Sequence, residues 1–271
     1  MLSKFIKLYK HLLLKFSEIL SGQVYITYMN LISMRAIKYC LYEHNYYVKQ
    51  GIRRHYFIQP RGSRYRNGLK YTGNKVMESY NLNLIKINTN DLVVDVGANN
   101  GDLILGLPTC RYIGFEPSPV EFRLLEKNKL PNHQVYNLAV GKENKDSVFY
   151  VSSRGADSSL FKPPVVDETI QIKQVRLDLV INESIKLLKI DAEGGELEVL
   201  IGALQLLDRI TFIAVDAGFE KGLHQETTAP EVLNFLFKHN FELVMLTNRL
   251  RFLFVNKSFI NYSLMNDNLK A

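Results

Sequence analysis

The sequence of 271 residues has only two cysteines and no tryptophan, and it has no apolar run long enough for a membrane-spanning helix. The cysteines, Cys40 and Cys110, exclude a disulfide framework and a Cys-x-x-Cys pair, so we expect a reducing, cytoplasmic location. Lysines interrupt the apolar positions of the first residues, which argues against a signal peptide. A hydrophobic content of 46% and a charged content of 23% exclude a chain that is disordered throughout.

Acidic residues are scarce in the first third of the chain. Residues 1–90 hold 15 Lys and Arg against 3 Asp and Glu, a net charge of +12, whereas residues 91–271 hold 19 against 24, a net charge of −5. This asymmetry is typical of a segment that meets nucleic acid, membrane headgroups or a phosphorylated substrate, and equally of a solvated face without a partner. Residues 2–20 have apolar positions at helical spacing. They predict an amphipathic helix that contacts a membrane surface through residues 1–20 or packs on a protein surface.

Three regions follow one another along the chain. We expect a basic, amphipathic, helical extension over residues 1–50, a lead-in of strands and loops over 51–90, and the main domain over 91–271. The main domain alternates apolar strand-like runs with helical segments, which predicts an α/β fold with a parallel sheet covered on both faces. We expect a Rossmann-like, seven-stranded, mostly parallel sheet that ends in an antiparallel C-terminal hairpin. Strands are predicted at 92–97, 112–115, 134–138, 148–151, 170–177, 185–190, 210–215, 242–246 and 250–255, and those at 148–151 and 170–177 are expected to be antiparallel around a polar loop. Helices are predicted at 120–129, 195–207 and 229–239, with a weaker one from 102.

A glycine-punctuated turn follows the first predicted strand of the main domain. The strand passes through Asp95 into Gly97-Ala98-Asn99-Asn100-Gly101. Glycine permits backbone angles forbidden to other residues and a close approach of a ligand, and ligands of open α/β sheets bind beyond the carboxyl ends of the strands. A dinucleotide site usually has a third glycine for the pyrophosphate, which is missing here. Asp95 suits the cationic methionine portion of S-adenosylmethionine better than a pyrophosphate.

Glu116 ends the second predicted strand of this domain, 21 positions after Asp95. An acid about 20 residues after the turn is placed to accept hydrogen bonds from ribose hydroxyls. The two features together predict a nucleoside site at this edge of the sheet.

Several stretches resemble the FkbM-type methyltransferase family in their order and spacing. They are residues 94–101, 115–119, 137–141, 176–178 and 188–203, and the resemblance extends over about residues 75–255. It implies S-adenosylmethionine as methyl donor and a hydroxyl, commonly on a sugar or natural product, as acceptor. It implies that Asp95, Gly97, Ala98, Asn99 and Gly101 hold the methionine end, that Glu116 and Pro117 lie at the ribose, that Ala139 lies near the adenine, and that Asp157, Ser158 and Ser159 form a small polar segment near the cofactor.

Acidic residues also follow the later strands. Asp191 and Glu193 come directly after the strand at 185–190, so they are candidates for the general base or for orienting the acceptor. Lys189 is equally a site residue or a strand-end ion pair, while Glu196 and Glu198 read as charges on a helix face. His224 is a further candidate base. Asp191 and Asp216 could bracket a divalent cation, but no spacing demands one and we expect no metal.

Arg and Tyr residues gather in the lead-in, and a phosphorylated acceptor or plain surface exposure would each explain them. They are Arg53, Arg54, Tyr56, Arg61, Arg64, Tyr65 and Arg66.

We predict an O-methyltransferase acting on a hydroxyl of a sugar, glycan or related small molecule, with no nucleic acid as partner. Two alternatives remain open. One is an RNA methyltransferase, because a basic Tyr- and Arg-rich surface could stack single-stranded RNA. The other is a non-catalytic nucleotide-binding or membrane-surface protein. The sequence leaves the oligomeric state undetermined.

Overall fold

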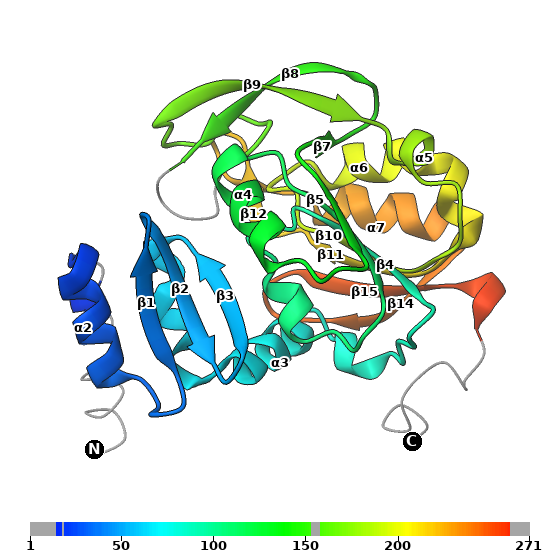
Figure 1. Cartoon of the computed structure of the whole chain (residues 1–271). Coiled ribbons are helices and arrows are strands. Elements are labelled where there is room, and N and C mark those ends of the chain that lie inside the picture. The colour runs from blue at the N-terminus through cyan, green and yellow to red at the C-terminus, as the bar shows by residue number, and fades with distance from the viewer. Residues whose placement is uncertain (1–14, 18, 153–157, 261–271) are drawn as a thin grey trace, which may run out of the picture.

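The core of the protein is a seven-stranded sheet (Figure 1), whose strands are β4 (Leu92–Val96), β5 (Arg111–Phe115), β6 (His133–Tyr136), β10 (Ile185–Ile190), β11 (Ile210–Asp216), β14 (Phe241–Leu246) and β15 (Arg251–Asn256). The structure, a computed structural model, describes residues 15–17, 19–152 and 158–260. The strand order is β14-β15-β11-β10-β4-β5-β6. The five strands from β11 to β6 are parallel, and β15 is antiparallel to both of its neighbours. The predicted mostly parallel sheet with its antiparallel C-terminal hairpin is therefore confirmed.

Helices cover both faces of this sheet, because its central strands are apolar on both sides. On one face Val94, Leu188 and Ile213 pack against α6 (Glu196–Gly202) and α7 (Ala229–Lys238). On the other face Val93, Leu187 and Phe212 belong to a cluster that includes α3 (Leu69–Ser79), η3 (Asp102–Leu105) and α4 (Pro119–Asn128). Every residue of β4 and of β10 is buried. This alternation of neighbouring residues between two covered faces explains the continuous apolar runs in the sequence.

Two predicted helices differ in detail from the structure. The helix predicted over 195–207 is divided into α6 and the 3-10 helix η4 (Leu204–Arg209). The division follows Gly202, where an added Cβ would lie 2.0 Å from the carbonyl oxygen of Gly141, so α6 ends in a tight backbone contact. The helix predicted from Asp102 is the single 3-10 turn η3.

A small sheet lies above the core sheet in Figure 1. It consists of β7 (Ala139–Val140), β8 (Lys145–Val151) and β9 (Glu168–Val175), and α5 (Leu177–Val180) follows it. β8 and β9 are antiparallel, as predicted. A further short hairpin, β12 (Phe219–Lys221) with β13 (Glu226–Thr227), follows β11.

The prediction of a helical extension over residues 1–50 is wrong for residues 38–50, which form two strands. A helix, α2 (Gly22–Ile32), is followed by an antiparallel sheet of β1 (Lys38–Tyr42), β2 (Asn45–Gln50) and β3 (Arg53–Phe57). Tyr and Val favour strands, and one face of the sheet buries Tyr39, Val48 and Phe57 against α2. Most of the helix predicted over residues 2–20 lies outside the described residues.

The lead-in over residues 51–90 was predicted to form strands and loops, and this is right for β3 but wrong for residues 59–79, which are mainly helical. After β3 come the 3-10 helix η1 (Gln59–Asn67), then α3, then η2 (Leu82–Leu84). At the other end of the chain, a last 3-10 helix, η5 (Lys257–Phe259), follows β15. α3 begins directly after Gly68, whose φ of 109° ends η1. Among the described residues, no helix has the length and apolar character needed to cross a membrane.

Candidate functional site

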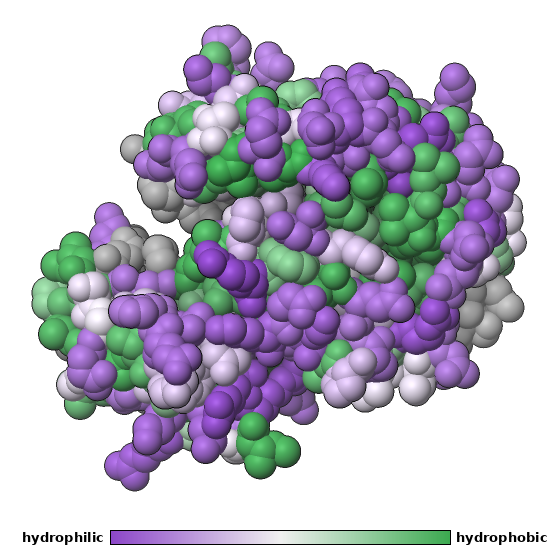
Figure 2. Space-filling model, turned by 45° about the horizontal axis from the view of Figure 1, so that its top comes forward, coloured by the Kyte–Doolittle hydropathy of each residue, from purple (hydrophilic) through white to green (hydrophobic). Residues whose placement is uncertain are grey.

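A cavity of about 530 Å³ opens at the carboxyl ends of β4, β5, β10 and β11. Its walls come from these strand ends, from the segment around β7 and β8, and from the N-terminal elements η1 and α3. We call α2, β1, β2, β3 and η1 the N-terminal lobe. Figure 2 shows the surface hollowed between this lobe at the left and the part of the molecule above it. The cavity therefore lies where ligands of open α/β sheets bind.

The turn after β4 forms the floor of the cavity and depends on glycine. Gly97 has a φ of 72°, and an added Cβ there would lie 1.8 Å from the carbonyl oxygen of Asp191. The amides of Gly97 and Ala98 both donate to the carbonyl oxygen of Phe115 at 3.0 Å. The ends of β4, β5 and β10 are thus held together at this turn, and no larger residue fits at position 97 without moving β10.

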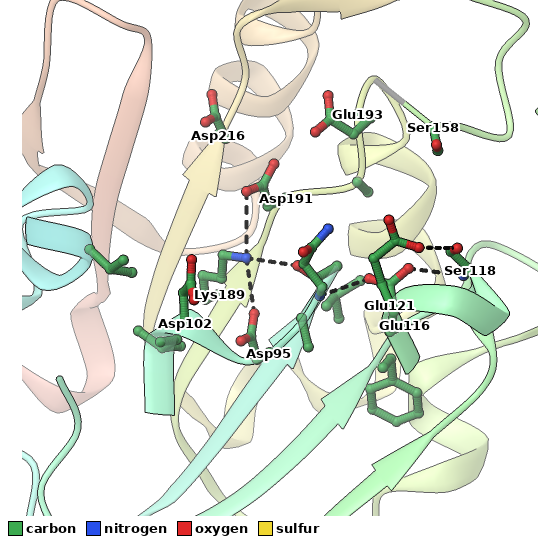
Figure 3. A pocket seen from close by; sticks show the side chains of 18 of the residues that line it. Asp95, Asp102, Glu116, Ser118, Glu121, Ser158, Lys189, Asp191, Glu193 and Asp216 are labelled. Carbon is green, nitrogen blue, oxygen red and sulfur yellow. Dashed lines mark hydrogen bonds and ion pairs between the residues drawn. The ribbon is translucent and has the colours of Figure 1, made fainter. Parts of the chain in front are cut away.

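Glu116 closes one side of this turn (Figure 3). Its Oε2 accepts a hydrogen bond of 2.8 Å from the amide of Asn99, and its Oε1 accepts one of 2.9 Å from the amide of Ser118. Burial raises the pKa of Glu116 to about 7, and the charge of nearby Glu121 also raises it. The hydrogen bonds from the two amides act in the opposite direction, because they stabilise the charged carboxylate. Each carboxylate oxygen keeps acceptor capacity on the cavity side.

Lys189 connects the two acids at the centre of the site. Its ammonium lies 3.0 Å from Asp95 Oδ1 and 3.6 Å from Asp191 Oδ2, and it donates to the Gly97 carbonyl oxygen at 3.1 Å. Burial alone would lower the pKa of Lys189, but the two carboxylates hold it above its ordinary value. Burial raises the pKa of Asp95 despite this partner and the 2.9 Å hydrogen bond from the Tyr112 hydroxyl. Removing Lys189 would leave a buried acid unpaired, a change that typically costs about 3–5 kcal/mol.

A tyrosine from the N-terminal region contacts the same acid. The hydroxyl of Tyr80, directly after α3, donates to Asp191 Oδ2 at 2.6 Å. The guanidinium of Arg251 lies 4.5 Å from the centre of the Tyr80 ring and donates to Asp216 Oδ2 at 2.5 Å. Although burial disfavours its charge, Lys189, Tyr80 and Arg251 hold the pKa of Asp191 below its ordinary value.

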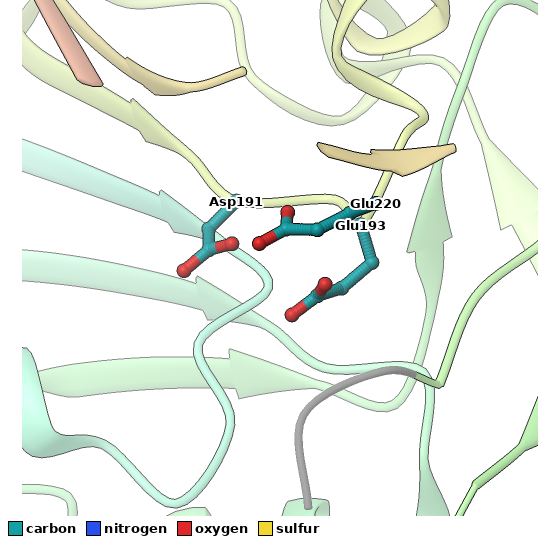
Figure 4. A group of neighbouring side chains, drawn as sticks. All are labelled: Asp191, Glu193 and Glu220. Atoms are coloured by element: carbon teal, nitrogen blue, oxygen red, sulfur yellow. The ribbon is translucent and has the colours of Figure 1, made fainter. Parts of the chain in front are cut away.

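Three carboxylates crowd the wall opposite the turn (Figure 4). Asp191, Glu193 and Glu220 each offer an oxygen atom within 4.8 Å of the others. Burial and the charges of Asp191 and Asp216 raise the pKa of Glu220 to about 8. A divalent cation is one group that such oxygens bind, and a shared proton is another way to relieve the repulsion. The expectation of no metal stays a prediction.

The remaining wall is apolar. Ser158 lies beside it, and its hydroxyl accepts a 3.0 Å hydrogen bond from the Ser152 amide. The neighbouring Ser159 hydroxyl donates to the carbonyl oxygen of Glu193 at 2.6 Å, which fixes this segment against the loop after β10. A planar, weakly polar group of a ligand would fit between these side chains. The apolar lining residues are Phe115, Leu138, Ala139, Val140, Phe149 and Leu160.

Most residues predicted from the sequence line this one cavity, namely Asp95, Gly97, Ala98, Asn99, Glu116, Pro117, Ala139, Ser158, Asp191 and Glu193. Gly101 does not line it; its φ of 86° shapes the turn from beneath. His224 is exposed and is not among the lining residues, so the structure does not bring this candidate base to the site. Asp157 lies outside the described residues.

Several residues of the cavity, among them Tyr80 and Arg251, were not predicted from the sequence. Tyr80 and Arg251 carry no local motif. Arg61 and Arg64 of η1 line the cavity, whereas Arg53, Arg54 and Tyr56 of the same Arg- and Tyr-rich stretch do not. Their role depends on how the N-terminal region folds back, which the sequence does not show.

Glu196 is not a charge on a helix face, as the sequence had suggested. It is only 1% exposed, and its carboxylate accepts hydrogen bonds from the amides of Ala192 and Gly194 and from the hydroxyl of Thr228. Burial raises its pKa to about 7. The residue therefore fixes the loop that carries Asp191 and Glu193.

Solved structures with similar folds include several methyltransferases. The methyltransferase FkbM from Methylobacillus flagellatus has a TM-score of 0.46 at 17% identity, and the match covers 71% of this chain and 56% of that chain. A TehB-like SAM-dependent methyltransferase from Corynebacterium glutamicum has a TM-score of 0.39 at 10% identity, covering 69% and 88%. Magnesium protoporphyrin IX methyltransferase from Synechocystis, solved with bound SAM, has a TM-score of 0.37 at 12% identity, covering 69% and 79%.

The sequence comparisons are more specific. A search of curated proteins found no match. The family description "Methyltransferase FkbM domain" matches residues 95–243, which is more than half of the chain and includes the turn after β4, Glu116 and the loop after β10. The chain therefore belongs to the FkbM methyltransferase domain family.

Proposed function

We propose that this protein transfers a methyl group from S-adenosylmethionine to a hydroxyl of a sugar, a glycan or a related small molecule. One observation carries the proposal. The turn after β4 and the acid at the end of β5 form one hydrogen-bonded unit, in which the Asn99 amide donates to Glu116 Oε2 at 2.8 Å, beside the cavity. Cys40 and Cys110 are free thiols, which suits a cytoplasmic reaction.

The residues of the cavity fit this donor. A volume of about 530 Å³ falls within the usual range for small-molecule sites. In this proposal Glu116 accepts hydrogen bonds from the ribose hydroxyls, the apolar wall around Phe115 and Ala139 holds the adenine, and the turn at Gly97 approaches the methionine portion. All of these residues line the cavity. S-adenosylmethionine supplies a methyl group that its sulfonium already activates, so the protein acts mainly by positioning the reactants.

The acids after β10 are the groups that would meet the acceptor. Asp191 is held ionised by Lys189 and by the Tyr80 hydroxyl, so it can orient an acceptor hydroxyl and receive its proton during the transfer. Glu193 and Glu220 flank it, and carboxylate oxygens are good acceptors for the several hydroxyls of a sugar. The polar character of this wall supports a polyhydroxylated acceptor.

Calorimetry tests the donor. Wild-type protein is titrated with S-adenosylmethionine and separately with NAD, and the same titrations are made with Glu116→Ala. We expect binding of the methyl donor only, weakened by about tenfold or more in the variant because the hydrogen bonds to the ribose are lost. Tight binding of NAD would overturn the assignment.

Mass spectrometry tests the acceptor class. The protein is incubated with S-adenosylmethionine and a panel of monosaccharides and oligosaccharides, and separately with RNA, with Asp191→Asn as the matched inactive variant. We expect a mass increase of one methylene group in at least one sugar with the wild type and none with the variant. If only RNA gains methyl groups, the sugar acceptor is wrong while the donor stands.

A further inference from the structure

The N-terminal sheet has a basic end. The strand β2 is antiparallel to both β1 and β3. The connection from α2 to β1 and the turn from β2 to β3 therefore lie at the same end of the sheet (Figure 1). Exposed cationic and aliphatic side chains gather at this end. We call the following six residues the basic tip: Met34, Arg35, Lys38, Lys49, Ile52 and Arg54.

Three of its cations stand directly opposite one another. Lys38 pairs with Lys49 across β1 and β2, and Lys49 pairs with Arg54 across β2 and β3. Like charges in this position destabilise a sheet. None of the three forms an ion pair with any described residue. An anionic partner would relieve this repulsion.

The surrounding sequence leaves the charge uncompensated. Between residues 34 and 77 the only acid is Glu43. Glu43 belongs to the turn between β1 and β2, at the opposite end of the sheet. The basic tip therefore presents a field of one sign.

Two aliphatic side chains project from the same end. Ile52, at the turn between β2 and β3, is 101% exposed, and Met34, before β1, is 55% exposed. Aliphatic side chains among cations are typical of proteins that lie on an anionic bilayer, where the apolar groups enter the headgroup region and the cations meet the lipid phosphates.

The same face is less suited to nucleic acid. Base stacking needs open aromatic rings, but Arg54 lies 5.5 Å from the centre of the Tyr47 ring and Lys127 lies 5.1 Å from that of Tyr56. The two tyrosines also pack against each other, with ring centres 5.3 Å apart.

We propose that the basic tip docks on the surface of a bilayer that contains anionic lipids. This surface is separate from the cavity, and none of the six residues lines it. The proposal is therefore independent of the proposed methyl transfer, and it places the contact in described residues outside 1–20.

Vesicle sedimentation of the full chain tests the proposal. Partitioning is measured on phosphatidylcholine vesicles with and without phosphatidylserine, for the wild type, the double variant Lys38→Glu and Lys49→Glu, and Ile52→Ser. The matched controls are Lys173→Glu with Lys257→Glu, two exposed lysines elsewhere without an ion pair among the described residues, and Leu179→Ser, whose side chain is 66% exposed. Thermal unfolding of each variant confirms that it is folded.

We expect binding to the phosphatidylserine vesicles only. One cation near such a surface is worth about fivefold in partitioning, so the double charge reversal should lower it by tenfold or more, and Ile52→Ser by about fivefold. The control variants should partition as the wild type, and salt at about 1 M should release the protein from the vesicles. The proposal is overturned if both tip variants partition onto vesicles as strongly as the wild type. It is also overturned if the basic tip binds oligouridylate RNA and the protein does not bind vesicles. Ile52 lies in an exposed turn, so its variant tests the surface even if the double variant fails to fold.

Discussion

At the scale of single residues, Tyr80 has a place in the site that its position in the chain does not indicate. It lies outside residues 95–243, which the family description matches, yet its hydroxyl donates to Asp191 Oδ2 at 2.6 Å. Its ring also lies beneath Arg251, which holds Asp216. Tyr80 therefore positions the two acids at the ends of the neighbouring strands β10 and β11.

Replacing Tyr80 by Phe should keep the ring and remove only the hydroxyl. The lost hydrogen bond should raise the pKa of Asp191, since that bond is one of the interactions that hold it low. We expect the acidic limb of the pH profile of kcat/KM to move to higher pH and kcat to fall by about tenfold, with the affinity for S-adenosylmethionine unchanged. Tyr71→Phe, another tyrosine of the cavity wall, is the control. An unshifted profile would show that the hydroxyl has only a structural role.

At the scale of elements, the turn between β4 and η3 depends on how closely β4 and β10 approach. Replacing Gly97 by Ala adds a Cβ that would lie 1.8 Å from the Asp191 carbonyl oxygen, at a φ of 72°. We expect the free energy of unfolding to fall by about 3 kcal/mol, which corresponds to a decrease in Tm of about 6–12 °C. Binding of S-adenosylmethionine should also be lost.

Gly222→Ala is the matched control for this change. Its φ of 70° carries the same backbone penalty, but an added Cβ there meets nothing within 4 Å. The control should therefore lose only about 1–2 kcal/mol. Equal losses in the two variants would mean that the contact with Asp191 contributes nothing.

The same elements show how far the sequence predicts the structure. The core strands were predictable because burial on both faces requires apolar runs such as Ile185–Ile190, and the motif around Gly97 has a fixed place after such a run. The helical prediction extended to residue 50 because local spacing does not reveal that Tyr39, Val48 and Phe57 share one face of a three-stranded sheet. Tyr80 and Arg251 join the site through tertiary packing alone. Glu196 was predicted to be exposed because the sequence does not show its partners. The backbone amides after β10 carry no side-chain signal, and Thr228 is distant in the chain.

At the scale of the whole molecule, the N-terminal lobe is fixed to the main domain by buried polar contacts. Asp102 accepts a 2.6 Å hydrogen bond from the Tyr65 hydroxyl, and His55 Nε2 lies 3.0 Å from the same carboxylate oxygen. Although burial disfavours its charge, His55 and Arg64 hold the pKa of Asp102 well below its ordinary value. The side chain of Arg61, which lines the cavity, donates to Asn99 Oδ1 at 2.5 Å. Unfolding of this lobe would therefore open one wall of the site.

The carboxylates around the cavity should make the stability of the whole protein depend on pH. Burial raises the pKa of Glu220 to about 8 and those of Glu116 and Glu196 to about 7, whereas an unfolded Glu titrates near about 4.3. Between these values the folded state binds more protons than the unfolded state, so the free energy of unfolding falls as the pH rises. Burial lowers the pKa of His133 to about 4, which acts in the opposite direction only below its unfolded value of about 6.5.

The window from pH 6.5 to 8 therefore excludes the opposing contribution of His133. We expect the Tm of the ligand-free protein to fall across it, with each ionising group contributing up to about 1.4 kcal/mol per pH unit. Glu220→Gln replaces the protonated form by a neutral amide of similar shape, so it should flatten this slope, and it should stabilise the protein most at pH 8. Glu226→Gln, at an exposed position, should leave the slope unchanged. A slope that is the same in Glu220→Gln and in the wild type would show that the acid wall of the cavity does not retain a proton at neutral pH. The crowding of Asp191, Glu193 and Glu220 would then have to be relieved by other means, and a bound cation is the means that their oxygen atoms allow.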